Sequence, residues 1–198
     1  CSPSRAAMMT GRYPTRAKVP GILFPNDGKG LPESETTLPS LLRQAGYRTS
    51  LVGKWHLGTD RSFMPLNRGF DEYFGVPYSN DMNPLVLCEG NDIVEEATVH
   101  SRLADRYTTR VSNIIGTASD QPFFCMMSHH LPHVPLEPSA SFRGKSRLGP
   151  YCDSLLELDS SVGRVLKALD NSGATNDTPD VAGLRAALVS HEKKLQYG

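Results

Sequence analysis

The pattern of apolar and polar residues alternates between helical and extended segments along the chain. Apolar side chains recur at helical spacing from Leu103 to Ile115 and again from Ser154 to Leu169, which predicts two amphipathic helices. Between them lies the continuous apolar run 123–128, which is typical of a strand buried on both faces. Residues 47–52 are interpreted as a second, short strand. This alternation predicts an α/β sandwich in which helices flank a largely parallel or mixed sheet.

Capping residues define two further helices. Pro3 suits the first turn of a helix that ends near Gly11, because proline has no N–H to leave unpaired there. Thr37 is a candidate N-cap for a helix that extends to Ala45.

Two stretches resist this pattern. Residues 60–97 are rich in Pro, Gly, Asn and Asp, so we interpret them as a long irregular excursion. Residues 184–195 predict a mildly amphipathic terminal helix, in a part of the chain where an α/β pattern calls for another buried strand.

The charge balance, the apolar runs and the cysteines exclude several classes of protein and partner. The 198 residues carry 21 basic and 21 acidic side chains, so no net field favours nucleic acid or an anionic membrane surface. No apolar run reaches the roughly 18 residues of a membrane span. The cysteines lack zinc-site spacing and are too sparse for a disulfide scaffold. They are Cys1, Cys88, Cys125 and Cys152, and their pairing stays open.

The first twelve residues, CSPSRAAMMTGR, hold the densest cluster of candidate chemistry. On a helix that begins at Pro3, Arg5 can turn its guanidinium toward position 1. The backbone N–H groups of the first turn point there as well, so this end of the helix favours an anion. The plain alternative is a terminal Cys1 followed by an Ala-rich helix.

Lys54 and His56 form a second cluster, just after the strand 47–52. Side chains two residues apart on a strand face the same side. A lysine and a histidine placed in this way can grip a tetrahedral dianion, and a neutral His can accept a proton. The alternative is that the two are ordinary surface residues without a functional role.

Three histidines follow the strand 123–128, in the segment SHHLPHVP. Ligands of open α/β sheets bind beyond the carboxyl ends of the strands, so this segment is a candidate binding loop. A transition-metal site is the alternative, but the two prolines make a stiff turn that disfavours joint ligation by His129 and His133. Near the last helix, Asp153, Glu157 and Asp159 are interpreted as capping and solvated residues.

The twelve-residue segment resembles the signature of the type I sulfatases, in which the cysteine is oxidised to formylglycine. The segment 53–58, GKWHLG, is similar to the second sulfatase signature. The resemblance covers residues 1 to about 178 and is closest to the arylsulfatase A-like group of the alkaline phosphatase superfamily. It implies an α/β sandwich, a calcium ion and the hydrolysis of a sulfate ester.

The resemblance also implies roles for the reacting groups. Cys1, as formylglycine hydrate, supplies the attacking hydroxyl and one calcium ligand, and Arg5 stabilises the hydrate. His56 takes the proton of the remaining hydroxyl, so that the intermediate collapses and releases sulfate.

Three residues are implied to bind the sulfate group itself. Lys54 and His133 hold sulfate oxygens, and His133 helps to protonate the departing alcohol. Ser79, in the segment YSND, is similar to a sulfate-binding serine of the family.

The family pattern sets the remaining expectations. Residues 1–178 are interpreted as part of a catalytic domain and 179–198 as a divergent tail. The other calcium ligands have no counterpart in the chain, so the isolated chain is expected to be inactive. Expected partners are a sulfated small molecule, sulfolipid or glycan, and the formylglycine-generating enzyme. Lysosomal or secreted residence and an oligomeric parent also follow from the family.

Two alternatives remain open at this point. One is a catalytically dead sulfatase-like module that binds sulfated glycans or a protein partner. The other is a phosphatase or phosphonate hydrolase of the same superfamily.

Overall fold

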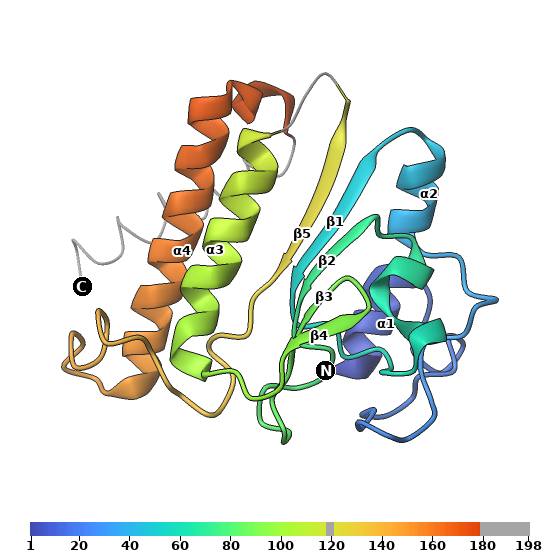
Figure 1. Ribbon diagram of the computed structural model, residues 1–198, viewed down its shortest axis with the longest axis horizontal. Helices are drawn as coiled ribbons and strands as arrows, with labels where there is room; N and C mark the ends of the chain where they lie inside the picture. The colour runs from blue at the N-terminus through green and yellow to red at the C-terminus, as the bar shows by residue number, and fades with distance from the viewer. Residues whose placement is uncertain (118–120, 179–198) are drawn as a thin grey trace.

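A central sheet with helices on both faces organises the computed structural model, which describes residues 1–117 and 121–178 (Figure 1). In this part of the chain the sheet has five strands in the order β4-β3-β2-β1-β5. The strands are β1 (Arg48–Gly53), β2 (Glu72–Gly75), β3 (Leu87–Glu89), β4 (Asp92–Glu95) and β5 (Phe123–Ser128). β1 pairs in parallel with both β2 and β5, whereas β3 is antiparallel to β2 and β4. The mixed sheet confirms the predicted α/β sandwich.

Helices cover the two faces unequally. Two long helices, α3 (His100–Gly116) and α4 (Pro150–Ser172), pack side by side on one face, and α1 (Ser2–Thr10) and α2 (Leu38–Gln44) lie on the other (Figure 1). Short 3-10 helices occur at η1 (Arg61–Phe63), η2 (Pro65–Arg68) and η3 (Ala174–Asp177). No helix among the described residues is both long and apolar enough to cross a membrane.

The capping residues behave as the sequence predicts. α1 has a proline in its first turn and ends at Gly11, which adopts a left-handed conformation with φ 66°. The hydroxyl of Thr37 accepts a hydrogen bond from the backbone N–H of Ser40 at the start of α2. Both helices are therefore confirmed, and α1 begins directly beside Cys1.

The expectation of an irregular excursion over residues 60–97 is wrong. This stretch contains η1, η2 and the strands β2, β3 and β4. The strands have only three or four residues each, and Gly90, with φ 62°, turns the chain between β3 and β4. Elements this short, set among turn-forming residues, give no readable periodicity.

β5 also departs from its prediction, because it is not buried on both faces. Only Ser128 of its six residues is buried, and the others are partly exposed. Among the described residues β5 pairs with β1 alone and forms an edge of the sheet. The apolar run therefore predicts the strand correctly, but it does not show whether the strand is central and buried or lies at an edge of the sheet.

α4 is longer than predicted, and the buried side of its first half is polar. Leu155, predicted on the apolar stripe, is 38% exposed, whereas Asp153 and Glu157 are buried. Asp153 accepts backbone hydrogen bonds from Gly144 and Ser146, and Glu157 accepts one from Ser139. The solvated-face interpretation is therefore wrong for these two acids, which hold the 139–146 loop.

Two sequence expectations have a simple outcome. All four cysteines are free thiols in the structure. The helix predicted over 184–195 lies outside the described residues.

Candidate active site

Cys1 stands at the start of α1, at the carboxyl-end side of β1 and β5. Its exposed thiol precedes a helix whose first residue, Ser2, is fully buried. The Ser2 hydroxyl accepts a hydrogen bond of 3.1 Å from the backbone N–H of Leu23. This bond fixes the start of α1 against the segment around Leu23, and so fixes the position of Cys1.

Lys54 links Cys1 to the loop that follows β2. It comes directly after β1, and its Nζ lies 3.2 Å from the Sγ of Cys1 and 2.7 Å from the Oγ of Ser79. The side chain is almost fully buried, and burial followed by the charge of Arg5 lowers its pKa to about 8. The structure thus brings together three residues that are 25 or more positions apart in the sequence.

Arg5 lies beneath this cluster rather than on Cys1. Its Nη1 donates to the backbone oxygen of Lys54 at 2.6 Å and to the Oγ of Ser128 at 2.5 Å. These are the residues that follow β1 and end β5, so Arg5 joins the ends of the two strands. Burial lowers the pKa of Arg5 to about 10, which leaves the guanidinium charged at neutral pH.

His56 reaches the site by a different route from the one predicted. β1 ends at Gly53, and His56 has a left-handed backbone with φ 64°, so the strand argument for Lys54 and His56 is wrong. The Nε2 of His56 lies 2.9 Å from the carbonyl oxygen of Leu23. Since a carbonyl only accepts, Nε2 carries the proton, and the buried Nδ1 has no hydrogen-bond partner in the described part of the chain.

The charge state of His56 follows from its surroundings. Burial, and then the positive charge of Lys54, lowers its pKa to about 4. The ring is therefore neutral at physiological pH, with the Nδ1 lone pair free to accept a proton.

His133 is partly exposed in the loop after β5. Its Nδ1 lies 2.7 Å from the backbone oxygen of Val134, and its backbone N–H donates to His130. It makes no hydrogen bond to Lys54 or Cys1 in the described structure. The charges of His133 and Lys54 both act on Asp81, which places the three side chains around one region.

Asp81 is a residue that sequence reasoning missed. Burial raises its pKa, but a hydrogen bond from Ser79 and the charges of His133 and Lys54 outweigh that effect and lower the pKa overall. The only available signal was its position two residues after Ser79.

His129 and His130 do not form a metal site with their neighbours. Their rings stack at 5.1 Å, and Tyr107 meets both edge-on. Within residues 1–117 and 121–178, no group of three or more His, Cys, Asp or Glu side chains is placed to hold a metal ion. Cys1 therefore has no companions there that fit the implied calcium ion.

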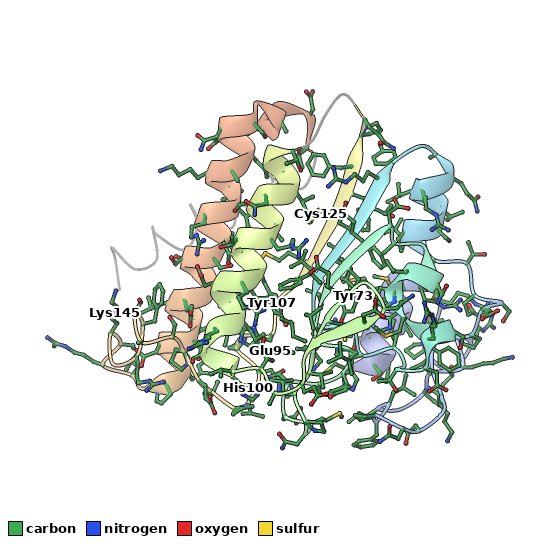
Figure 2. The ribbon with its side chains drawn as sticks, viewed as in Figure 1. Tyr73, Glu95, His100, Tyr107, Cys125 and Lys145 are labelled. Carbon is green, nitrogen blue, oxygen red and sulfur yellow. The ribbon has the colours of Figure 1, made fainter. Side chains whose placement is uncertain are left out.

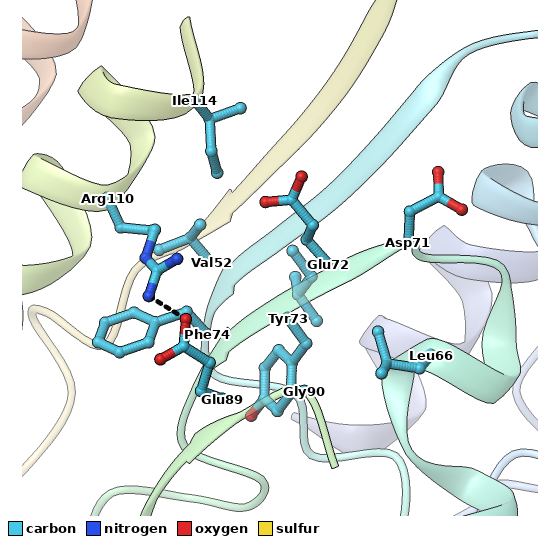
Figure 3. Close-up of a pocket in the computed structure, with 11 residues that line it drawn as sticks. Val52, Leu66, Asp71, Glu72, Tyr73, Phe74, Glu89, Gly90, Arg110 and Ile114 are labelled. Atoms are coloured by element: carbon cyan, nitrogen blue, oxygen red, sulfur yellow. Dashed lines mark hydrogen bonds and ion pairs between the residues drawn. The ribbon is translucent and has the colours of Figure 1, made fainter. Parts of the chain in front are cut away.

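Two cavities of the described structure lie away from Cys1. One, of about 180 Å³, sits beside β2 and contains an ion pair between Arg110 and Glu89 (Figure 3). Its other two carboxylates, on Asp71 and Glu72, are also bonded within the protein. The other cavity, of about 570 Å³, lies between α3 and α4. Neither of these cavities is lined by a predicted site residue.

Comparison with known proteins identifies the class of fold and then the family. The structure is an α/β sandwich with a thiol, a lysine and a serine gathered beyond its parallel strands. The chain matches the Sulfatase family model over residues 1–179. The chain belongs to the sulfatase family.

Individual relatives agree with this assignment. The chain is 34% identical to human "Arylsulfatase A" and 37% identical to "N-acetylgalactosamine-6-sulfatase" of Mus musculus, with 90% of the chain aligned in both cases. It spans 41% and 39% of the length of these two proteins. A solved structure from work on glycosaminoglycan metabolism by Bacteroides thetaiotaomicron superimposes with a TM-score of 0.82 at 26% identity, over 89% of this chain and 50% of that one.

Proposed function

We propose that this chain carries the reacting centre of a sulfuric ester hydrolase. The single observation that supports the proposal best is the contact of Lys54 Nζ with both Cys1 Sγ and Ser79 Oγ. A buried ammonium held between a reactive side chain and a hydroxyl suits a tetrahedral dianion, because it can neutralise charge while the hydroxyl donates to an oxygen. A sulfate ester has this tetrahedral shape with one negative charge, and the sulfate released from it is the dianion.

The nucleophile in this proposal is Cys1 after oxidation to formylglycine by the formylglycine-generating enzyme. One hydroxyl of the aldehyde hydrate attacks sulfur and loses its proton to solvent at the exposed position 1, while the bond from sulfur to the alcohol oxygen breaks. The alcohol leaves with a proton supplied by His133, and the sulfate group stays on the formylglycine carbon. Lys54 and Ser79 hold the sulfate oxygens during this step.

Release of sulfate completes the cycle. Nδ1 of His56 accepts the proton of the remaining hydroxyl, the carbon–oxygen bond to sulfate breaks, and the aldehyde re-forms and takes up water. The bound anion raises the pKa of His56 from its value in the free site, because an opposite charge favours the protonated ring. Arg5 holds the backbone of Lys54 in place and adds positive charge beneath the hydrate.

The substrate class in this proposal is a sulfated small molecule, sulfolipid or glycan. The names of the relatives support it, because one is an arylsulfatase and another acts on a sulfated N-acetylgalactosamine. Lysosomal or secreted residence, and an oligomeric state, are part of the same proposal.

The test is the mass of the peptide that bears position 1, measured on the full-length gene product expressed in eukaryotic cells. Conversion of the thiol to an aldehyde lowers that mass, and the same preparation is expected to hydrolyse an aryl sulfate faster than an aryl phosphate. Cys1→Ala is expected to reduce the rate to background. An unmodified thiol without turnover would instead identify a binding module, and a preference for aryl phosphate would identify a phosphatase.

A further inference from the structure

Asn80 lies between the two loops that carry Ser79 and His133. Its side chain is 1% exposed, and its Nδ2 donates to the backbone oxygen of Val134 at 3.0 Å. Asn80 is the immediate neighbour of Ser79, and Val134 is the immediate neighbour of His133. One hydrogen bond therefore ties together the two loops in which the sulfate-binding residues are proposed.

His100 anchors the same tie to a long helix. It is the first residue of α3 (Figure 2), and its Nε2 donates to the backbone oxygen of Asn80. Its Nδ1 lies 3.9 Å from a carboxylate oxygen of Glu137, in the loop that carries His133. Because α3 packs on the sheet and on α4, His100 fixes the loop of Asn80 to the rigid part of the fold.

The burial of Asn80 is unfavourable for stability alone. Its Oδ1 is buried and has no hydrogen-bond partner in the described part of the chain. A buried polar atom without a partner costs free energy, so an apolar residue of similar shape would be better tolerated at this position if packing were the only requirement. The remaining contact of the amide, with Val134, is the one that joins the two loops.

We infer that Asn80 is a positioning residue for the sulfate site, setting the separation between Ser79 and His133. The inference rests on the proposed function, in which these two residues contact one anion. Two groups that grip the same tetrahedral anion must keep their spacing, and a displacement of about 1 Å can lower a rate by roughly 100-fold. Asn80 itself touches neither the sulfate nor the nucleophile in this scheme.

The first experiment compares Asn80→Leu with Asn67→Leu in the full-length gene product. Asn67 is a matched control, since its exposed amide also donates to a backbone oxygen, that of Arg61 at 2.5 Å, away from the site. Rates on an aryl sulfate are divided by the fraction of position 1 converted to aldehyde. Asn80→Leu is expected to lower kcat/KM about tenfold or more and to raise the inhibition constant of inorganic sulfate. Asn67→Leu is expected to stay within about twofold of the unchanged protein.

A double-mutant cycle separates positioning from loss of fold. If Asn80 acts through the His133 loop, Asn80→Leu is expected to cost under about twofold when His133→Ala is already present. An equal loss in both backgrounds would overturn the inference and leave the proposed function intact. An unchanged protein that converts position 1 but cleaves no aryl sulfate would overturn the proposed function first.

A second variant covers the case in which Asn80→Leu does not fold. His100→Phe removes the other end of the tie and is expected to show a smaller loss with the same dependence on His133. Additive losses with His133→Ala would again overturn the inference.

Discussion

Lys54 is the residue on which the site depends, because it is a buried cation without a carboxylate at ion-pair distance in the described structure. Its hydrogen-bond partners are the thiol of Cys1 and the hydroxyl of Ser79, and the charge of Asp81 offsets only part of the effect of burial and of Arg5. A cation in such a setting is poorly compensated, which is why burial and Arg5 lower its pKa to about 8. In the proposed function an arriving sulfate ester supplies negative charge, so the cost of burying Lys54 is offset when the substrate binds.

Replacing this cation is expected to weaken sulfate binding selectively. Lys54→Met keeps the length and apolar stem of the side chain but removes the ammonium, and we expect kcat/KM on an aryl sulfate to fall about 100-fold or more. The inhibition constant of inorganic sulfate should rise in parallel. Lys29→Met, at an exposed lysine, is the control and should change neither value. Equal sulfate affinity in the two variants would contradict a sulfate-binding role for Lys54.

Arg5 is expected to matter for stability as well as for activity. A single nitrogen, Nη1, donates to the backbone oxygen of Lys54 and to the Oγ of Ser128, and the long planar guanidinium holds that nitrogen between the two strand ends. We expect Arg5→Lys to lower the free energy of unfolding by about 2–3 kcal/mol, and Ser128→Ala, which removes one of the partners, by about 1 kcal/mol. Denaturant unfolding of the two variants measures the difference. A larger loss in Ser128→Ala than in Arg5→Lys would show that the guanidinium is not the link between the strand ends.

At the scale of elements, glycines let the strands converge below the site. A Cβ on Gly53 would lie 2.0 Å from the backbone oxygen of Ser128, and a Cβ on Gly75 would lie 1.9 Å from the backbone oxygen of Gly53. These residues end β1 and β2, next to Lys54 and just before the loop of Ser79. The close approach of the three strand ends is therefore a condition for the contact between Lys54 and Ser79.

Two alanine substitutions test this close approach. Gly75→Ala should destabilise the protein by about 3 kcal/mol or more, because the added methyl group meets backbone and no flexible side chain can yield. Gly163→Ala in α4 meets no atom within 4 Å and should stabilise the helix by about 0.5–1 kcal/mol. Unfolding free energies of the two variants should thus move in opposite directions. A mild effect of Gly75→Ala would mean that the strand ends have room to separate.

The sequence predicts long elements better than short ones. α3, of 17 residues, follows from a 3.6-residue period, and the apolar residues that the period selects are buried. The short helix α2 follows from its capping residue, Thr37, and not from a period. The strands β2, β3 and β4 have too few residues to display a period, and their position in the sheet depends on pairing with β1 and with one another. Burial of β5 likewise depends on how many neighbours it has, which no local pattern contains.

For the site, motifs identify residues but not the contacts between them. Lys54, Ser79 and Cys1 are found from local signatures, and the structure supplies the distances that join them. The bond of His56 to Leu23 depends on a left-handed backbone at His56, which is uncommon for any residue other than glycine and which no local pattern signals here. The hydrogen bond of Asn80 cannot be predicted for a related reason, since its partner, Val134, lies 54 residues away in the chain.

At the scale of the whole molecule, the buried His130 and the partly buried His129 join the α3 layer to the loops of the site. Burial lowers the pKa of His129 to about 4, and burial together with nearby positive charge lowers the pKa of His130 well below its usual value. Both rings pack against Tyr107 of α3. They are neutral parts of the core, and protonation of either ring opposes the folded state.

This arrangement predicts a protein that loses stability in acid. Between a pH of about 6.5, where an unfolded histidine titrates, and the lower pKa of the folded state, the unfolded chain binds more protons, so the free energy of unfolding falls as the pH falls. Each buried ring contributes up to about 1.4 kcal/mol per pH unit in this window. His130→Phe keeps a buried ring against Tyr107 but cannot titrate, so urea unfolding from pH 7 to pH 5 should show a shallower loss of stability. His133→Gln, at a partly exposed position in the same loop, is the control and should retain the steep dependence. If His130→Phe were as acid-labile as the unchanged protein, the loss would have to come from groups outside this pair, and the rings would not be the acid-sensitive part of the core.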